Sequence, residues 1–319
     1  MSKSPSHRCQ KGIALITAML VMALATIAAA AVLGSANAAI RRTATLIDGE
    51  RAWWYADGVE SWVLSILERD RKDNDTDSFE DKWTQKLDYL PVEQGGLSGE
   101  LEDLQGRFNL NNLAATGANA KVYGQQFQRL FVQAGLEASQ AQPVADAIRD
   151  WIDENQTPTG SGGEDSDYMG LEQPYRAANR EMRSPSELLA VKGMSREIYL
   201  QLAPLVATLP LGASKAATKV NINTAPQAVL MALSEKPNEQ EIVKWLEDRK
   251  KAPTKDPSEL QKRGALSADA TPDMTSTSTE YFLMKATAFI GSGRVSLYSV
   301  VRRPASGPPI VIARSLDTE

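Results

Sequence analysis

Residues 11–40 read KGIALITAMLVMALATIAAAAVLGSANAAI, and this stretch decides the fold. From Ile13 to Ile40 it carries no charged side chain, which is more than the ~20 apolar residues that a helix needs to cross a bilayer. Lys3, Arg8 and Lys11 flank its N-terminal side, so the short N-terminal end is expected to stay cytoplasmic while the bulk of the chain faces outward. The sequence therefore predicts one membrane-spanning helix, with residues 13–40 as its transmembrane part.

Three processing schemes are compatible with this start. A secretory signal peptide would be cut at Ala36-Asn37-Ala38, but its apolar region should span only ~7–15 residues. An uncleaved signal anchor is the second scheme. The third is a type IV pilin-like leader, a short basic peptide that ends at Gly12 and is removed to leave Ile13 as the new N-terminus. We favour the third scheme, with residues 1–12 as a prepilin leader peptide.

The helical pattern continues beyond the membrane. Apolar side chains recur at a spacing of three or four residues, at Ala52, Ala56, Val59, Val63 and Ile66. The polar run over 70–77 ends this pattern. A single helix over 13–70 would be ~87 Å long at 1.5 Å per residue. The alternative is two separate helices with a break near Gly49.

The rest of the chain mixes strand and helix patterns. Helices are predicted around 123–131 and 144–152, as two short pieces within 186–206, and over 225–234 and 238–250. Strands are predicted within 97–109, at 220–223, over 280–290 and 294–303, and at 308–314. Gly291-Ser292-Gly293 joins two of these strands as a hairpin. Strands on both sides of a helical block indicate an α+β fold with an inserted α-helical domain over 111–217.

Composition excludes several classes of function. The chain of 319 residues has a net charge of −5 and no cluster of Lys and Arg of the kind that binds nucleic acid. Its one cysteine, Cys9, and its one histidine, His7, both precede Gly12. Removal of the leader therefore leaves no cysteine nucleophile, no histidine base and no zinc site built on these residues. We predict that the protein is not an enzyme.

An acidic loop is the strongest candidate site. Asp153 and Glu154 end a predicted helix, a Gly-rich turn follows over 155–163, and the acids of Glu164-Asp165-Ser166-Asp167 come next. Such a reversal brings carboxylates together, and like charges repel unless a cation lies between them. Oxygen donors in an irregular arrangement suit calcium better than magnesium. A solvated acidic loop without metal is the alternative, and a paired-carboxylate glycosidase is disfavoured because no aromatic-lined cleft accompanies the acids.

A second motif resembles the opening of a helix-hairpin-helix DNA-binding module. It consists of VNINTA at 220–225 followed by apolar residues to Leu233. Such modules bind phosphate through backbone N–H groups of a Gly-rich hairpin. Here the hairpin position, residues 234–239, has no glycine pair and contains Glu235 and Glu239. We therefore favour a structural role for this motif.

Several motifs together point to one family. They are the Gly12 cleavage site, GRFNLN at 106–111, DWID at 150–153, EDSDY at 164–168, PYRAAN at 174–179, SELL at 186–189 and VNINTA at 220–225. Over nearly the whole chain this combination resembles the minor pseudopilins of type II secretion known as general secretion pathway protein K. The resemblance implies a pilin-like antiparallel sheet, formed by residues 41–110 and 218–319, with the helical domain inserted over 111–217.

The resemblance also implies a function. Proteins of this family form the tip of the periplasmic pseudopilus with two other minor pseudopilins, on a filament of the major pseudopilin, and initiate or limit its assembly for export of folded proteins. A prepilin peptidase would cut after Gly12, Ile13 would be methylated, and the protein would span the inner membrane once with its soluble domain in the periplasm. A type IV pilus minor pilin and a helix-hairpin-helix DNA-binding membrane protein are the alternatives; we expect no nucleic acid partner.

Calcium is bound in the inserted domain of this family. Carried over to this sequence, the resemblance places calcium on five residues, which are Asp153, Glu164, Asp165, Asp167 and Asn179.

One residue departs from the wider pilin pattern. Ordinary pilins have glutamate at the fifth mature position, where its partner is thought to be the terminal ammonium of a neighbouring subunit. Here that position is Thr17. Threonine cannot neutralise an ammonium, so no subunit needs to lie ahead of this one.

Overall fold

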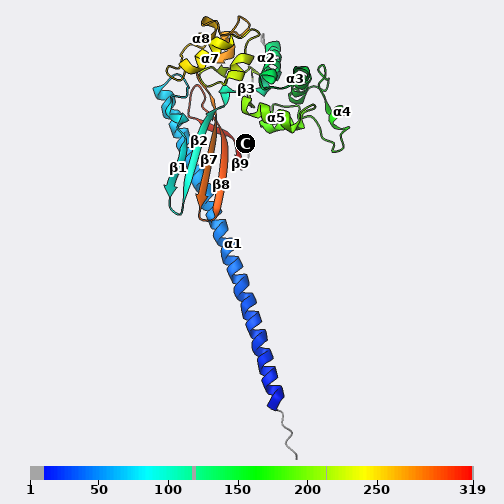
Figure 1. Ribbon diagram of the computed structural model, residues 1–319, viewed down its shortest axis with the longest axis vertical. Coiled ribbons are helices and arrows are strands. Elements are labelled where there is room, and N and C mark those ends of the chain that lie inside the picture. The colour runs from blue at the N-terminus through cyan, green and yellow to red at the C-terminus, as the bar shows by residue number, and fades with distance from the viewer. Residues whose placement is uncertain (1–10, 117–119, 213, 318–319) are drawn as a thin grey trace, which may run out of the picture.

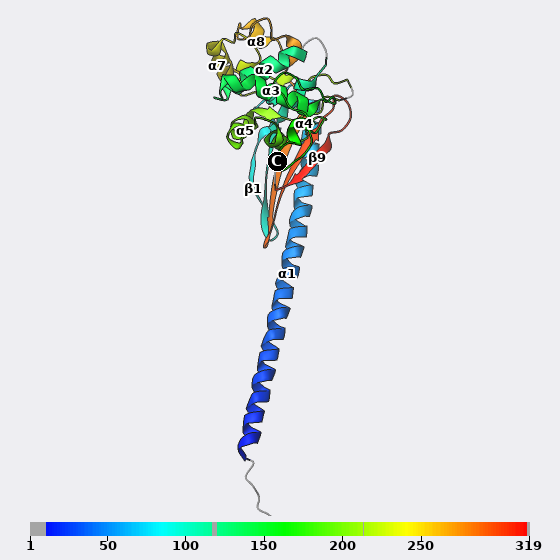
Figure 2. The ribbon, with the colours of Figure 1, turned by 90° about the vertical axis from the view of Figure 1, so that its right-hand side faces the viewer.

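Helix α1 (Lys11–Asp73) dominates the computed structural model, which describes residues 11–116, 120–212 and 214–317. The helix runs unbroken for 63 residues, which corresponds to about 95 Å at 1.5 Å per residue. Its backbone is helical through Gly49. The single-helix prediction is therefore confirmed, and the alternative of two helices is wrong. Figures 1 and 2 show α1 as a stalk that carries all other elements at one end.

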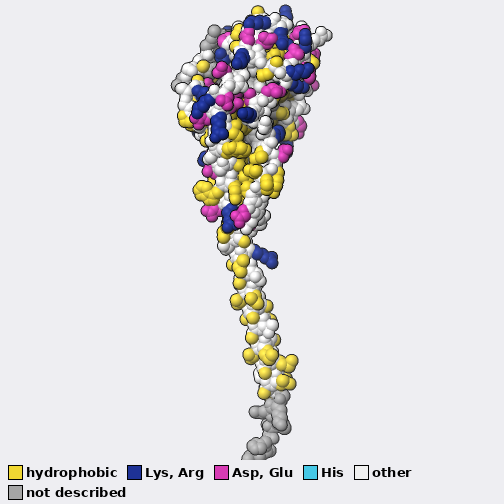
Figure 3. Space-filling model, turned by 90° about the vertical axis from the view of Figure 1, so that its left-hand side faces the viewer, with side chains coloured by type: hydrophobic (Ala, Val, Ile, Leu, Met, Phe, Trp, Pro, Cys, Tyr) yellow, Lys and Arg dark blue, Asp and Glu magenta, His cyan; other side chains and the backbone are white. Residues whose placement is uncertain are grey.

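The first half of α1 is long and apolar enough to cross a membrane. Its apolar side chains are exposed in the isolated chain; Met22, for example, is 69% exposed and Leu24 is 58% exposed. Figure 3 shows this apolar stalk below a head that carries most of the charged side chains. A helix satisfies its own backbone hydrogen bonds, so it is one of the few structures that hydrocarbon tolerates. The predicted long apolar N-terminal helix is confirmed.

A five-stranded antiparallel sheet packs on the second half of α1. Its strand order is β1-β2-β7-β8-β9. The strands are β1 (Leu87–Val92), β2 (Gly95–Asp103), β7 (Tyr281–Ile290), β8 (Gly293–Arg302) and β9 (Ile310–Leu316). Alternate β7 side chains, from Phe282 to Ile290, point toward α1, as the period of two in a strand requires. They meet a helical stripe of Ala52, Ala56, Val59, Val63 and Leu67.

Strand β1 is an element that sequence analysis missed. Most of its side chains are exposed, so it lacks the alternation that marks a half-buried strand. Pro91 and the glycines at 95 and 96 further obscure the pattern. Gly96 is needed because a Cβ at that position would lie 2.0 Å from the Tyr89 ring.

A helical layer lies at the end of the sheet farthest from the membrane segment (Figure 1). Its helices are α2 (Ala120–Gln133), α3 (Ala138–Ile152), α4 (Asp165–Tyr168), α5 (Arg196–Leu202), α6 (Gln227–Ala232), α7 (Glu239–Asp248) and α8 (Glu259–Lys262). Two short parallel ladders join its loops, β3 (Phe108–Asn109) with β4 (Val206–Ala207) and β5 (Val220–Asn221) with β6 (Thr275–Ser276).

One hydrophobic core unites this layer. It contains Phe127 of α2 and Ile148 of α3, both fully buried. The same core contains Leu230 of α6 and Trp245 of α7. Helices up to residue 262, beyond the insertion predicted over 111–217, share this core.

A buried ion pair joins the sheet to the end of α1. The Arg303 guanidinium, 5% exposed, donates to Asp70 Oδ2 at 2.9 Å and to the Asp77 carboxylate, which is 1% exposed. It also donates to the Thr279 carbonyl at 2.9 Å and stacks over the Phe282 ring at 4.9 Å. One side chain thus connects the end of β8, the C-terminal end of α1 and the segment before β7.

A second ion pair attaches strand β9 to α1. Glu60, 3% exposed, accepts hydrogen bonds from Arg314 Nε at 2.9 Å and from Ser299 Oγ at 2.6 Å. Burial raises the pKa of Glu60, but the Arg314 and Ser299 hydrogen bonds outweigh it and hold that pKa below its usual value. The charged form of Glu60 therefore depends on Arg314.

We expect Arg314→Ala to lower the free energy of unfolding by about 1–3 kcal/mol, because it leaves the buried Glu60 carboxylate without its counter-ion while Arg314 itself is half exposed. Urea denaturation of the full-length chain in detergent, followed by tryptophan fluorescence, measures the change. Arg294→Ala, on the exposed tip of the same sheet, is the control and should cost about 0.5 kcal/mol or less. Equal losses for the two variants would show that the Glu60 pair does not stabilise the fold.

Candidate functional site

The acidic loop between α3 and α4 is organised by two buried aspartates of α3. Asp150, fully buried, accepts hydrogen bonds from the Thr159 N–H on both carboxylate oxygens at 3.0 Å. Asp146 Oδ2 accepts from the Ser161 N–H at 3.2 Å. Gly162 permits this close approach, because a Cβ there would lie 2.0 Å from Asp150 Oδ2. The chain reversal is thus built around carboxylates that sequence analysis did not assign to the site, although their spacing of four residues places them on one helix face.

Glu164 lies at the centre of this acidic group. It is 2% exposed, and neither of its carboxylate oxygens has a hydrogen-bond partner among the described residues. Burial, and then the charges of Asp150, Asp153, Asp165 and Asp167, raise the pKa of Glu164 to about 7. A buried carboxylate without a donor is costly. A nearby positive charge or protonation would therefore stabilise the Glu164 carboxyl group.

The other predicted ligands are distributed around Glu164. Asp153 caps the end of α3, and its Oδ1 accepts from the Asn155 N–H at 3.0 Å. Burial, and the neighbouring Asp150, raise the pKa of Asp153. The Asn179 backbone N–H donates to the Trp151 carbonyl at 3.0 Å, while its side-chain Oδ1 is buried without a partner. Its backbone is left-handed, with φ of 48°, a conformation that asparagine tolerates better than most residues.

Asp165 and Asp167, like Asp153, already accept hydrogen bonds. Asp165 Oδ1 accepts from the Ala177 N–H at 3.0 Å. Asp167 pairs with Lys192 at 2.8 Å and accepts the Glu164 N–H at 3.2 Å, which closes a helix cap at the start of α4. The Lys192 hydrogen bond, followed by the Glu164 N–H, lowers the pKa of Asp167. Sequence analysis missed Lys192 because it lies 25 residues from its partner.

The donor set suits a hard cation. Glu164 and Asn179 have three unpartnered oxygens, and the surrounding acids supply further oxygens of the type that calcium takes. Within the described ranges, however, no three acidic side chains are close enough together to enclose a metal ion. A bound cation would therefore have to draw these oxygens inward.

The motif that resembles a DNA-binding hairpin is closed by internal contacts. The Glu235 N–H donates to Asp269 Oδ2 at 2.8 Å, and Ser234 Oγ contacts Ser267 Oγ. Asn221, fully buried, donates to Asp103 Oδ2 at 2.8 Å. The backbone N–H at the turn is thus already satisfied by a carboxylate, in the place where a phosphate would have to bind.

Fold and site together define a class of protein. An apolar N-terminal helix whose outer half packs on one face of an antiparallel sheet is the architecture of membrane-anchored, pilin-like subunits, and here a helical layer is added to it. Two family models match the chain, both described as type II secretion system (T2SS), protein K, over residues 106–211 and 220–279.

Curated relatives extend this match to nearly the whole chain. The type II secretion system protein K of Aeromonas hydrophila is 32% identical over 97% of this chain and 98% of its own length. That of Pseudomonas aeruginosa is 33% identical over 97% of this chain and 94% of its own. A chain in the crystal structure of the GspK-GspI-GspJ complex from the enterotoxigenic Escherichia coli type 2 secretion system is similar with a TM-score of 0.70 and 26% identity, covering 87% of this chain and 100% of that one. The chain belongs to the type II secretion system protein K family and is a minor pseudopilin.

Proposed function

We propose that this chain forms the tip of the periplasmic pseudopilus with two other minor pseudopilins, and that it initiates or limits assembly of the filament for export of folded proteins. The observation that carries the proposal is the helical layer at the end of the head farthest from the membrane segment (Figure 2). The similarity to a chain crystallised in the GspK-GspI-GspJ complex supports the two companions.

The helical layer is an obstacle to a further subunit. Head-to-tail contacts between identical surfaces grow an open filament unless one face cannot accept the next subunit. The core of this layer draws on residues from Phe108 to Ala270, so more than half of the head contributes to it. It occupies the space that the head of a subunit stacked above would need. This favours a single copy at the end of the filament over a repeating position in the shaft.

Thr17 supports the same position. Its hydroxyl lies 3.1 Å from the Ile13 carbonyl and 3.0 Å from the Ala14 carbonyl, so it bonds within its own helix. It offers no negative charge to the terminal ammonium of a subunit ahead. Thr17, the fifth residue after the proposed cleavage site, therefore does not require a subunit ahead of this one.

A pull-down of the full-length chain with the two companion minor pseudopilins tests the complex, and labelling of surface filaments tests the position. We expect both companions to be retained, label at filament ends, and shorter filaments when this chain is in excess. Thr17→Glu should leave secretion largely intact, because an unpaired glutamate takes up a proton. Label distributed regularly along the filament would refute the tip assignment.

We further propose that a prepilin peptidase cuts after Gly12, that Ile13 is then methylated, and that the chain spans the inner membrane once with its head in the periplasm. Helix α1 is continuous through residues 36–38, so the signal-peptidase alternative would require cleavage within a helix. N-terminal sequencing of membrane-extracted protein should begin at methylated Ile13. A sequence that begins at Ala39 would disprove both the cleavage and the anchor.

Calcium is the cation we propose for the acidic loop. Glu164, Asp153 and Asn179 would hold it, because their oxygens are unpartnered or belong to carboxylates of raised pKa. Asp165 and Asp167 would contribute by exchanging their present hydrogen bonds. The ion would neutralise Glu164 and fix the loop between α3 and α4.

A further inference from the structure

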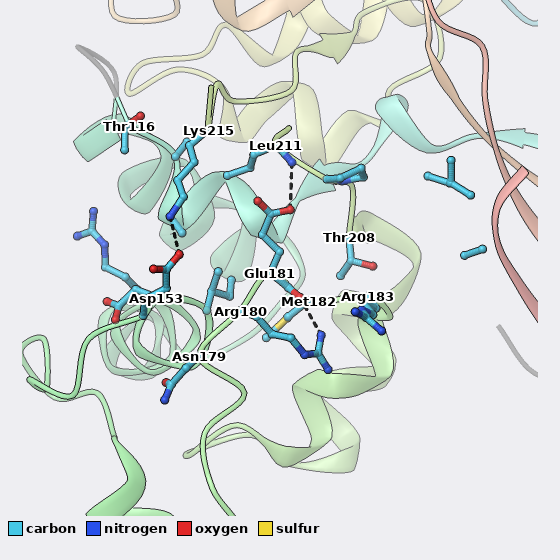
Figure 4. Close-up of a pocket in the computed structure, with 18 of the residues that line it drawn as sticks. Thr116, Asp153, Asn179, Arg180, Glu181, Met182, Arg183, Thr208, Leu211 and Lys215 are labelled. Carbon is cyan, nitrogen blue, oxygen red and sulfur yellow. Dashed lines mark hydrogen bonds and ion pairs between the residues drawn. The ribbon is translucent and has the colours of Figure 1, made fainter. Parts of the chain in front are cut away.

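A large cleft separates the helical layer from the upper part of strand β9. Its volume is about 1260 Å³, above the ~300–1,000 Å³ of typical small-molecule pockets. One wall includes Arg149 of α3 and the segment 179–183, and the other includes Ile312 and Arg314 of β9. Figure 4 shows Arg183 and Thr208 on the side nearer the strands, with Asp153 and Asn179 on the far side. The volume of the cleft thus exceeds that of a typical small-molecule site.

The cleft is basic in an acidic protein. Six cationic side chains line it, namely Arg149, Arg180, Arg183, Lys215, Arg302 and Arg314, against three acids, Asp153, Glu154 and Glu181. Four of these cations have a carboxylate within 4 Å. Arg149 and Arg183 have none among the residues that the structure describes. An anionic ligand would find two guanidinium groups there that are not held in an ion pair.

Strand β9 supplies a backbone edge to the same cleft. It is the last strand of the sheet and pairs only with β8, so its outer N–H and C=O groups have no strand beside them in the described structure. Exposed edges are usually protected by outward charges or proline. Here the Arg314 side chain forms an ion pair with Glu60. The side chains on this strand that remain exposed include Ile310, which is 47% exposed, and Ile312, which is 40% exposed. An unprotected, partly apolar edge is the surface that accepts an added strand.

We infer that this cleft binds an extended, acidic segment of another protein, which adds to the edge of β9 as a further strand and places carboxylates against Arg149 and Arg183. The cationic side chains of the cleft favour an acidic segment, and the free backbone edge of β9 favours an extended one. Strand β9 itself leads away from the cleft, since Asp317, the last described residue, donates its N–H to the Ser296 carbonyl at 2.8 Å, lower on the sheet. The inference does not depend on the tip position proposed above.

Fluorescence anisotropy with the full-length chain in detergent tests this assignment. The probe is a fluorescein-labelled octapeptide of alternating Glu and Val; a Lys and Val octapeptide and a form of the acidic peptide with alternate backbone nitrogens methylated are the comparison ligands. We expect the acidic probe to bind more weakly as salt rises, and both comparison ligands to bind at least about tenfold more weakly than the probe, because one lacks the charge and the other the backbone donors.

Paired variants locate the site. Arg149→Gln with Arg183→Gln should weaken binding of the acidic probe about tenfold or more, since each removes a charge-assisted hydrogen bond. Arg196→Gln with Lys236→Gln removes the same charge from exposed positions outside the cleft and should change affinity less than about twofold. Arg183→Gln alone, at an exposed and unpaired side chain, keeps the test valid if the double variant misfolds. Equal losses of affinity in the cleft and control variants would overturn the inference, and so would equal binding of the methylated peptide. It would also be overturned if the probe bound by dissociating a self-associated form of this chain.

Discussion

Arg303→Ala is expected to lower the free energy of unfolding by about 3–5 kcal/mol, the range observed when one partner of a buried ion pair is removed. The substitution leaves the Asp77 carboxylate, 1% exposed, and the Asp70 carboxylate, 9% exposed, without a positive neighbour. Burial already raises the pKa of Asp77 to about 6, against the attraction of Arg303. Urea denaturation of the full-length chain measures the loss.

The pH dependence of the Arg303 variant provides a second readout. Without Arg303 both carboxyls are easier to protonate, and their neutral forms tolerate burial. The loss should therefore be larger at pH 8 than at pH 5. Arg302→Ala is the matched control, because Arg302 is adjacent, 43% exposed and 3.5 Å from Glu280, so its removal should cost about 1 kcal/mol or less. A small loss at Arg303 that does not change with pH would show that the pair is energetically neutral.

Calcium is expected to raise the melting temperature of the full-length chain by about 5–10 °C when its concentration is a hundredfold above the dissociation constant. A ligand that binds only the folded state adds about 2.7 kcal/mol under that condition, and each kcal/mol corresponds to about 2–4 °C in a domain of this size. A bound ion would supply a positive charge next to Glu164. A thermal scan with calcium and with a chelator measures the shift.

Variants separate a metal site from a general salt effect. Glu164→Gln and, separately, Asp153→Ala with Asp167→Ala should abolish the calcium shift. Glu172→Gln, at an exposed acid beyond the loop, should preserve it. An identical melting curve with calcium and with chelator in the unmodified chain would return the loop to a solvated acidic surface.

Sequence pattern predicted those parts of the fold whose cause is local. The uninterrupted apolar run and the stripe from Ala52 to Val63 specify α1, and the glycines between 290 and 294 specify the hairpin of β7 and β8. Strand β1 was missed because its side chains do not alternate between buried and exposed, and it is held in the sheet by pairing with β2. The shared core of α2, α6 and α7 could not be predicted from local pattern, because it is a tertiary contact between distant segments.

The candidate site was also predicted only in part. The acidic residues of the loop could be identified in the sequence, but the different interactions that each of them makes could not. Asp146 and Asp150 hold the loop backbone, Asp167 holds Lys192, and Glu164 has no partner. These roles depend on where the chain reverses, and a list of acidic residues does not contain that information. The basic cleft was not anticipated either, since its cations come from α3, from loops and from the last two strands of the sheet.

The unbroken helix α1 connects the membrane segment to the head without a hinge. The head contacts this helix close to the apolar segment, where Asp48 Oδ2 accepts from the Ser292 N–H at 2.9 Å and Thr45 Oγ1 accepts from Ser292 Oγ at 3.4 Å. Only residues 41–44 separate these contacts from the apolar segment, and they are helical too, so the helix has no hinge there. Each residue added in this neck would raise the head by about 1.5 Å and turn it by about 100°. The number of residues between the bilayer and the sheet therefore sets the rotational orientation of the head toward its neighbours. A rotation of the membrane segment about the helix axis would be transmitted to the head.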